Sequence, residues 1–307
     1  MRAIIDMGSN TMRLSIYQFK EGIPELVLSK KKMVGLASYI NKAGLMTDEG
    51  IQAALKALNE FKLVLNNLNI RKKYVIATAA IRNALNQQQI LDTLRKKTRL
   101  NIELISGEDE ALYDLKGVLL MEKFDEGIIL DIGGGSTELV IYEDAEVKNA
   151  LSLPIGSLNS YMKYVDHLIP TKKEKKKIEA KVLKLLKPYD IQIPEGYTMY
   201  GVGGTLRGAL KLAKYHYGDS VSNHEISFPM LKELIRSNQP NKKDLVPILQ
   251  SAPERIHTIT TGMIIAKTIM KIYQSKLIIV NYYGLREGYI YSKFIEERLK
   301  RQQNGKK

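Results

Sequence analysis

Two copies of one short segment carry the residues best suited to chemistry. LDIGGGSTELVIY (130–142) places Asp131 and three consecutive glycines between two apolar stretches. IDMGSNTMRLSIY (5–17) aligns with it without a gap, with Asp6 over Asp131 and Gly8 over Gly133. Each copy therefore joins an acid to a turn of small residues, and the duplication predicts two related domains.

The turn in each copy is suited to binding an anion. Glycine lets backbone N–H groups approach a ligand closely, and consecutive N–H groups form an anion-binding nest. An acid beside such a turn would repel a phosphate unless a divalent cation lay between them, so the pattern points to metal and phosphate together. A tight hairpin without a ligand is the alternative, which a single glycine-rich turn would fit equally well.

A third segment, ISGEDEALYDLKGV (105–118), gathers acids at the start of an expected helix. Ser106 stands at the N-cap, and Glu108, Asp109 and Glu110 follow in the first turn. Helix capping and the helix dipole favour these residue types, so the acidity has a purely structural explanation as well.

Two more segments could hold phosphate. ATAAIRNALN (77–86) follows a strand and offers Arg82 as a clamp, or simply as a surface arginine. YGVGGTLRGAL (200–210) combines a strand, a glycine turn and a helix start, which suits phosphate at a helix N-terminus. Its likeness to a dinucleotide-binding fingerprint is weak.

The elements that must position these residues alternate between strands and helices, which predicts the α/β class. No low-complexity linker interrupts the chain, and the boundary falls near 124–127, giving domains at 1–125 and 126–307. We expect strands near 3–7, 12–18, 24–29, 74–78, 102–105, 127–131, 136–142, 147–153, 197–202 and 277–280, and helices near 48–67, 87–99, 107–122, 157–166, 173–187, 205–216, 229–237, 254–273 and 286–302.

Composition excludes several classes of protein. The 307 residues contain no cysteine, so disulfides and thiolate chemistry are excluded, and the four histidines lack metal-ligand spacing. No apolar run approaches the roughly 20 residues of a membrane span, and no signal peptide opens the chain. We expect a soluble cytoplasmic protein without a membrane partner, and the sequence leaves open whether it is a monomer or a homodimer.

The net charge of +14 predicts attraction to polyanions. The segment 171–187 holds eight lysines and two glutamates, while Ile178, Val182, Leu185 and Leu186 share one helical face. This helix is either a solvated basic face or a rail for a long anionic substrate. Nucleic acid is not expected, because aromatic residues interleaved with the lysines, which base stacking requires, are absent.

Taken together, the motifs resemble those of the exopolyphosphatase and guanosine pentaphosphate phosphohydrolase family, within the actin-like ATPase and sugar-kinase superfamily. The resemblance implies two ribonuclease-H-like (actin-like) domains around a central cleft, with the two hairpin turns as phosphate loops. It also implies a short form that lacks the C-terminal helical region of longer relatives. The matching stretches are AIIDMGSNTMRLSIY, ATAAIRNA, ISGEDEA, LDIGGGSTEL, LPIGSLN, GVGGTLRGAL, PERIHTITTGM and YGLREG.

The family's functional residues can be placed on this chain one by one. The general base falls on Glu110, and Mg²⁺ or another divalent cation falls on Asp131 and Glu138. The internal alignment sets Arg13 opposite Glu138, so one turn offers a cation where its twin offers a metal ligand. The phosphate contacts fall on Gly8, Ser9, Asn10, Arg13, Arg82, Gly133, Gly134, Gly135, Ser136, Thr137 and Arg255.

This chain also departs from the family pattern. Asn281 and Tyr282 replace a common Ser-Asp before Tyr283, and Thr261 replaces a common proline before Gly262. The implied substrates are inorganic polyphosphate, which the basic excess favours, and guanosine pentaphosphate. A non-catalytic polyphosphate or nucleotide sensor and an actin-like kinase are the alternatives from other classes. The retained acids argue against the sensor, and SGEDEA argues against the kinase.

Overall fold

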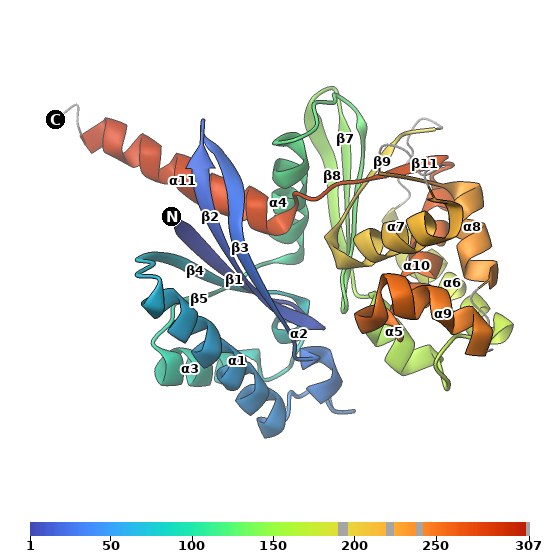
Figure 1. Ribbon diagram of the computed structural model, residues 1–307, viewed down its shortest axis with the longest axis horizontal. Helices are drawn as coiled ribbons and strands as arrows, with labels where there is room; N and C mark the ends of the chain where they lie inside the picture. Colours follow the sequence, from blue (N-terminus) through green and yellow to red (C-terminus); the bar gives the residue numbers. More distant parts are fainter. Residues whose placement is uncertain (190–195, 219–223, 238–241, 305–307) are drawn as a thin grey trace. The chain divides into compact units, whose positions relative to one another are not determined.

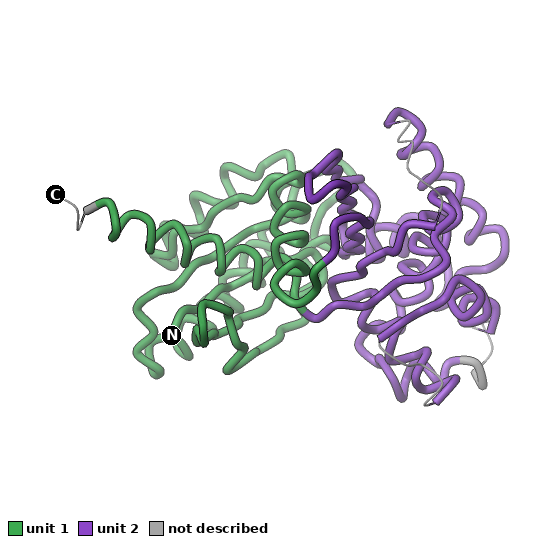
Figure 2. Tube along the Cα trace, turned by 90° about the horizontal axis from the view of Figure 1, so that it is seen from above, with its two compact units in different colours: residues 1–123, 283–307 green, residues 124–282 purple. Residues whose placement is uncertain are grey.

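The computed structural model describes residues 1–189, 196–218, 224–237 and 242–304. The chain forms two compact units, which we call unit 1 and unit 2 (Figure 2). Unit 1 comprises Met1–Lys123 and Tyr283–Lys307, and unit 2 comprises Phe124–Tyr282. The chain passes from unit 1 to unit 2 between Lys123 and Phe124, close to the predicted boundary at 124–127. The sequence-based division differs at the other end, because it assigned residues 283–307 to the second domain, whereas they belong to unit 1.

Unit 1 is built on a five-stranded sheet in the order β3-β2-β1-β4-β5 (Figure 1). Strands β1 to β3 pair antiparallel, and β4 and β5 run parallel to β1. The strands are β1 (Arg2–Met7), β2 (Thr11–Lys20), β3 (Ile23–Met33), β4 (Lys72–Ala77) and β5 (Ile102–Leu104), and the helices are the 3₁₀ helix η1 (Leu36–Tyr39), α1 (Asp48–Asn67), α2 (Ala79–Arg82), α3 (Gln87–Thr98), α4 (Gly107–Leu119) and α11 (Leu285–Asn304).

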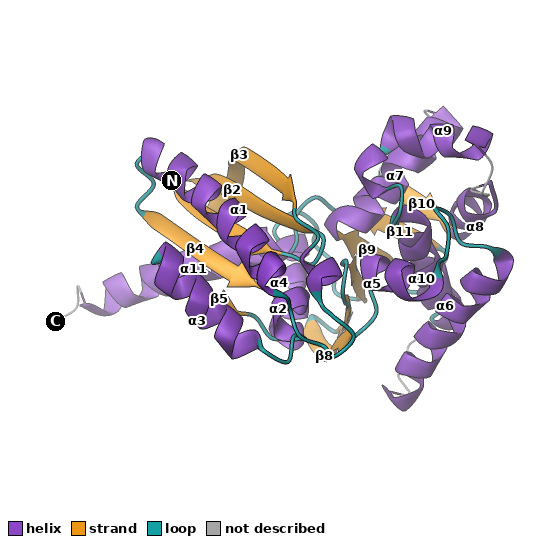
Figure 3. Cartoon of the chain, turned by 90° about the horizontal axis from the view of Figure 1, so that it is seen from below, coloured by secondary structure: helices purple, strands orange, loops and turns teal. Residues whose placement is uncertain are grey.

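Helices cover both faces of this sheet (Figure 3). Successive residues of a strand point to opposite faces, so Ile5 packs into the cluster that holds the apolar sides of α1 and α3. Ile4 packs instead with Tyr289 and Ile290 of α11. A strand covered on both sides reads as a continuous apolar run, which explains the AII sequence before Asp6.

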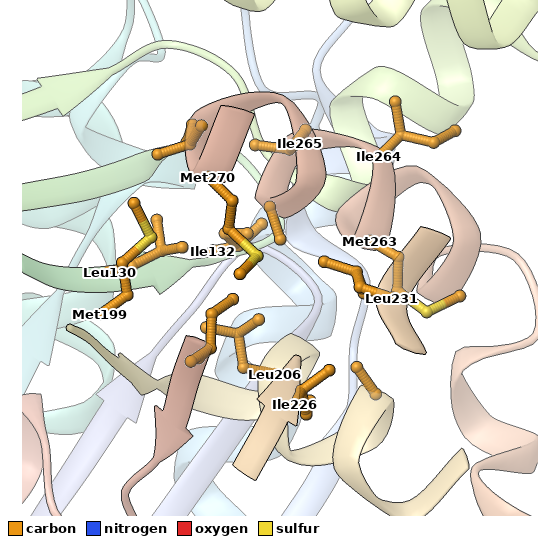
Figure 4. Packing of buried hydrophobic residues seen from close by; sticks show 14 of the residues in the cluster. Leu130, Ile132, Met199, Leu206, Ile226, Leu231, Met263, Ile264, Ile265 and Met270 are labelled. Carbon is orange, nitrogen blue, oxygen red and sulfur yellow. The ribbon is translucent and has the colours of Figure 1, made fainter. Parts of the chain in front are cut away.

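Unit 2 is built on a six-stranded sheet in the order β10-β11-β9-β6-β7-β8. Its core gathers Leu130 and Ile132 of β6 around the almost wholly buried helix α10 (Figure 4). The strands are β6 (Gly127–Ile132), β7 (Thr137–Glu143), β8 (Glu146–Leu153), β9 (Met199–Val202), β10 (Glu225–Ser227) and β11 (Leu277–Val280), and the helices are α5 (Ser157–Tyr164), α6 (Lys172–Leu186), the 3₁₀ helix η2 (Lys187–Tyr189), α7 (Gly203–Tyr217), α8 (Phe228–Ser237), α9 (Lys242–Ser251), the 3₁₀ helix η4 (Pro253–Arg255) and α10 (Ile259–Ile272).

The two sheets confirm the duplication. Strands β1 to β4 of unit 1 correspond in order and direction to β6 to β9 of unit 2. The second and third strands also shift register at matching points, between Ile16 and Tyr17 and between Ile141 and Tyr142. The predicted α/β class with two ribonuclease-H-like sheets is confirmed.

Most predicted elements are present, and the missed ones are short or interrupted. Strand β10 has only three residues at a sheet edge, and α2 has only four residues. Helix α9 contains Pro247, which removes a backbone donor and so disguises a helix in the sequence. Among the described residues, no helix is both long enough and apolar enough to cross a membrane.

Charged contacts anchor the outer part of α11 to the sheet of unit 1. Arg2 of β1 donates to the Glu297 carboxylate at 2.6 Å, and the Tyr74 hydroxyl of β4 donates to it at 2.8 Å. Lys72 forms a further ion pair with the same carboxylate. The hydrogen bond from Arg2 is the main cause that lowers the pKa of Glu297 to about 2, against the opposing effect of burial.

This pKa shift predicts that Glu297 stabilises the protein above, and not below, its titration range. The folded pKa of about 2 lies under the ordinary value of 4.5, so the stabilisation is present above pH 4.5 and is lost as the pH falls toward 2. We expect Glu297→Gln to lower the melting temperature at pH 7 by a few degrees and by less at pH 3, at about 2–4 °C per kcal/mol. The exposed neighbour Glu296, replaced by Gln, is the control. An equal loss at both pH values would contradict the assignment.

Candidate functional site

The triple-glycine turn of unit 2 has its carbonyl groups fixed by the next helix. The turn is closed by the Gly133 N–H, which donates to the Ser136 carbonyl at 3.0 Å. The carbonyl oxygens of residues 133–135 accept hydrogen bonds of 2.8–3.0 Å from residues 157–159 at the start of α5. In a trans peptide the C=O and N–H point in opposite directions. The N–H groups of residues 134–136 therefore point away from α5, in the arrangement of an anion-binding nest.

The corresponding turn of unit 1 is closed in the same way. The Gly8 N–H donates to the Thr11 carbonyl at 3.2 Å. The carbonyls of Ser9 and Asn10 accept hydrogen bonds from residues 34–37, at the start of η1, at 2.9–3.2 Å. The N–H groups of Asn10 and Thr11 consequently point away from η1, so both repeats present backbone donors at matching positions.

Beside the turn of unit 2, two acids lie directly opposite each other across the strands. Asp131 of β6 pairs in register with Glu138 of β7, and Glu138 pairs in turn with Ser152 of β8. Residues opposed in this way present their side chains on the same face of the sheet. Glu138 is only 2% exposed, and the Ser152 hydroxyl donates to its Oε1 at 2.8 Å. The result is a row of oxygen ligands at the edge of the turn.

In unit 1 the same row has the opposite charge. Asp6 of β1 pairs in register with Arg13 of β2, and Arg13 pairs with Lys31 of β3. The Arg13 guanidinium also donates to the Ser29 hydroxyl at 2.9 Å. The alignment of Arg13 with Glu138 that the sequence repeat predicted is thus a structural equivalence, with two cations in one repeat where the other has an acid and a serine.

The row in unit 2 fits a hard divalent cation. Carboxylate and hydroxyl oxygens are the donors that Mg²⁺ and Ca²⁺ prefer. No group of three or more His, Cys, Asp or Glu side chains placed to hold a metal occurs in the part of the chain that the structure describes. The pair Asp131 and Glu138 would leave positions for water and phosphate oxygens, which is the usual way that proteins hold Mg²⁺.

The N-terminus of α7 lies against this row, and its glycines make room for side chains. A Cβ atom on Gly203 would lie 1.9 Å from an Asp131 carboxylate oxygen, and Gly203 adopts φ +78°. A Cβ atom on Gly204 would lie 1.9 Å from the Arg255 guanidinium. Burial lowers the pKa of Arg255, while the nearby carboxylates of Glu254 and Asp131 oppose the shift. Arg255 and Asp131 therefore share one end of the sheet with the triple-glycine turn.

In unit 1 the candidate base is held by the candidate phosphate clamp. The Ser106 hydroxyl caps α4 as predicted, accepting from the Asp109 N–H at 3.0 Å, and Glu110 follows in the first turn. Arg82, at the end of α2, donates to the Glu110 carboxylate at 2.7 Å and to the Ile105 carbonyl at 3.0 Å. Their side chains are 16% and 9% exposed, so Arg82 is not a surface arginine. This ion pair holds the Glu110 carboxylate in place beside the Ile105 carbonyl that the same guanidinium contacts.

Comparison with known proteins assigns the chain to a family. The model of the Ppx/GppA phosphatase family matches residues 15–297. The chain belongs to this family. A crystal structure of the Ppx/GppA family member from Aquifex aeolicus superposes with a TM-score of 0.78 at 26% identity, covering 96% of this chain and 97% of that one.

Two curated relatives of this chain are named for two different substrates. Exopolyphosphatase 1 of Mycobacterium tuberculosis is 32% identical over 157 residues, 50% of this chain and 46% of that protein. The guanosine-5'-triphosphate,3'-diphosphate pyrophosphatase of Aeromonas hydrophila is 28% identical over 295 residues, 94% of this chain and 58% of that protein. The chain spans about half the length of the curated relatives it matches.

Two residues that support the turn of this Ppx/GppA protein were not identified from the sequence. The Asn159 side chain donates to the Gly135 carbonyl and accepts from the Gly156 N–H, both at 2.8 Å. The hydroxyl of Thr261, one of the departures from the family pattern, donates to the Ser157 carbonyl at 2.7 Å and so ties α10 to α5. The spacing of Gly156 and Asn159, three residues apart at a helix start, is a capping pattern that could have revealed the first.

Thr137, one of the predicted phosphate contacts, uses its hydroxyl in a hydrogen bond within the protein. The Thr137 side chain is buried, and its hydroxyl donates to the Ile155 carbonyl at 2.6 Å. Thr137 also pairs in register with Ile132 of β6 and Leu153 of β8, so its predicted phosphate contact stays a prediction.

Proposed function

We propose that this chain is an exopolyphosphatase, which hydrolyses the terminal phosphoanhydride of inorganic polyphosphate and releases phosphate. The observation that carries the proposal is the pair of matching backbone nests, one flanked by two acids and the other by one acid and two cations. One nest is equipped for a phosphate that shares a metal, and the other for a phosphate neutralised directly by arginine and lysine. Each nest by itself is suited to a phosphate group of an anionic substrate.

In this proposal Glu110 acts as the base that orients and deprotonates water. Hydrolysis of a phosphoanhydride passes through a loose transition state, so positioning and charge neutralisation supply most of the rate. The nucleophile is water, and the hydroxyls of Ser9 and Ser136 donate hydrogen bonds. The phosphate oxygens are bound by Ser9, Asn10, Arg13, Arg82, Gly134, Gly135, Ser136, Thr137 and Arg255. The N–H groups of Gly8 and Gly133 close the two turns instead, so these glycines shape the turns and do not donate to phosphate.

We further propose that Asp131 and Glu138 hold Mg²⁺ or another divalent cation. When bound, the cation neutralises charge on the phosphate oxygens. The protein's own contribution is to hold the two carboxylates in cross-strand register, with Ser152 orienting Glu138 and Gly203 leaving space for Asp131.

The basic helix α6 favours polyphosphate over a nucleotide. Its buried side consists of Glu174, Ile178, Val182 and Leu186, and Lys172, Lys173, Lys176 and Lys177 are exposed. Lys175 differs from these four, because its Nζ donates to the Ile235 carbonyl at 2.8 Å and burial lowers its pKa. Four lysines on two exposed turns create a field that a long polyanion can use and a single nucleotide cannot.

Guanosine pentaphosphate is the second candidate substrate. It is favoured by the Aeromonas hydrophila relative, whose match extends over 94% of this chain. Both substrates end in a phosphoanhydride, so the same nests and the same base would serve either one. Phosphate release from long polyphosphate and from guanosine pentaphosphate, measured side by side, decides between them, and release from neither would favour a non-catalytic sensor.

The role of Glu110 can be tested by an isosteric change. We expect Glu110→Gln to lower turnover by roughly 10² or more, since the amide cannot accept the proton of water. The exposed Glu108 of the same helical turn, replaced by Gln, should retain near-parental turnover and serves as the control. If Glu110→Gln hydrolyses the substrate at the parental rate, Glu110 is not the base.

Metal dependence provides a second test. We expect a chelator to abolish hydrolysis and added Mg²⁺ to restore it. Asp131→Asn and Glu138→Gln should each raise the Mg²⁺ concentration needed for half-maximal activity by roughly tenfold, the cost of about 1.4 kcal/mol in metal binding. Full activity in excess chelator would exclude the proposed cation.

The lysine helix provides a test of the substrate. We expect replacement of Lys172, Lys173, Lys176 and Lys177 by Gln to raise the apparent KM for long polyphosphate roughly tenfold at low salt, if each lysine contributes a few tenths of a kcal/mol. The effect should shrink near 0.15 M salt, where the screening length is about 8 Å, and should be small for guanosine pentaphosphate.

The matched control removes the same charge elsewhere, by replacing the exposed lysines 56, 96, 97 and 123 of unit 1. Equal changes in KM for the two fourfold variants would mean that net charge alone matters. An unchanged KM in the α6 variant would mean that the lysines of this helix are solvated and do not contribute to substrate binding.

A further inference from the structure

The helix that carries Glu110 is held by backbone contacts with residues from the far end of the sequence. A Cβ atom on Gly117 of α4 would lie 2.3 Å from the Gly284 carbonyl oxygen. A Cβ atom on Gly288 of α11 would lie 1.9 Å from the Tyr113 carbonyl oxygen of α4. These separations are far below any normal contact distance. The two helices can approach this closely only because both positions lack a side chain.

Buried carboxylates connect the same two helices and extend the connection to the sheet. Asp114 of α4, 1% exposed, accepts a hydrogen bond from the Leu285 N–H at 2.7 Å. Glu287 of α11 accepts from the Gly284 N–H at 3.0 Å and from the hydroxyl of Tyr17. Burial raises the pKa of Tyr17, and the Glu287 carboxylate raises it further, so the hydroxyl keeps the proton that it donates.

Tyr17 belongs to β2, the strand that begins at the turn of residues 8–10. The contacts therefore run from the phosphate turn of unit 1 along β2 to the first turn of α11, and from there to α4. Asp114 lies one helical turn after Glu110, and residues one turn apart on a helix move together. Residues 284–288 lie between α4 and β2 and set the spacing between them. The position of Glu110 relative to the turn of residues 8–10 thus depends on these residues.

We propose that residues 284–288 and Asp114 are positioning residues for Glu110. The proposal rests on the proposed role of Glu110 as the base. These residues do not reach the substrate in this scheme. They fix α4 so that the Glu110 carboxylate stays 2.7 Å from Arg82.

Gly288→Ala tests the proposal, because the added methyl group must push α4 away from α11. We expect turnover to fall roughly 10–100-fold with little change in KM, the usual result of misplacing a catalytic group by about 1 Å. Leu65→Ala in α1, a buried position of the same unit remote from α4, is the control for lost stability. It should lower the melting temperature without lowering turnover at temperatures where the protein is folded.

A double-mutant cycle shows whether the effect passes through Glu110. In the Glu110→Gln background, Gly288→Ala should cause little further loss, because there is no base left to misplace. An equal loss in both backgrounds would overturn the proposal and leave the proposed function intact. Parental activity in Glu110→Gln alone would show that Glu110 is not the base. The positioning proposal would then fail, while the proposed hydrolysis would stand.

Asp114 gives an independent test if Gly288→Ala does not fold. Asp114→Asn keeps an oxygen that can accept from the Leu285 N–H, and we expect near-parental turnover. Asp114→Leu keeps the branched shape with two methyl groups in place of the oxygens, and so removes the acceptor. It should lower turnover as Gly288→Ala does, again only where Glu110 is present. Parental turnover in folded Asp114→Leu would contradict the positioning role.

Discussion

Two carboxyl side chains, those of Asp131 and Glu138, lie on directly opposed strand residues of unit 2. The arrangement of the groups around them depends on this pair. Like charges placed across an antiparallel pair destabilise a sheet. Asp131 and Glu138 occupy such a pair near the end of β6. The surroundings meet this cost locally: the Ser152 hydroxyl donates to Glu138, and the positive charge of Arg255 lies near Asp131. A bound cation would neutralise the remaining negative charge of the two carboxylates. The stability of this strand pair and the proposed hydrolysis would therefore both benefit from a cation at the same place.

Unit 1 has the same turn and strand arrangement as unit 2, but two of the side chains beside its turn are positively charged. Its turn is closed by the matching hydrogen bond, and its strands shift register at the matching residue. The side chains beside the turn differ, with Arg13 and Lys31 in place of Glu138 and Ser152. Duplication thus preserved the parts that shape the main chain and left the flanking charges free to diverge.

The sequence was sufficient to predict features that depend on local pattern. Alternating apolar residues located nearly all strands, and the repeat around Asp6 and Asp131 indicated two equivalent turns. Ser106 and the acids after it correctly indicated the start of α4. These features could be recognised because capping and strand periodicity act between residues close in the chain.

Contacts between distant residues could not be predicted in this way. The pairing of Arg82 with Glu110 depends on how α2 and α4 follow neighbouring strands. The contact of Gly117 with Gly284 involves no side chain on either partner, so it leaves no apolar or charged signature. For that reason the sequence placed residues 283–307 in the second domain. The sequence showed Thr261 only as a departure from the family pattern. It did not indicate the supporting contacts of Asn159 and Thr261, since each acts by bonding to backbone groups that any residue could supply.

The discontinuity of unit 1 has a consequence for the order of events during synthesis. Unit 2 is one uninterrupted segment, Phe124–Tyr282, so all of its contacts are available once that segment has left the ribosome. Unit 1 begins first but needs α11, which is translated after the whole of unit 2. Domains made of contiguous segments tend to fold as they emerge. Until residues 285–297 arrive, the Tyr17 hydroxyl and the apolar face around Ile4 and Ile76 lack their final cover. The part of the chain made first is therefore completed last, and this exposed face is where a nascent chain would need protection from aggregation.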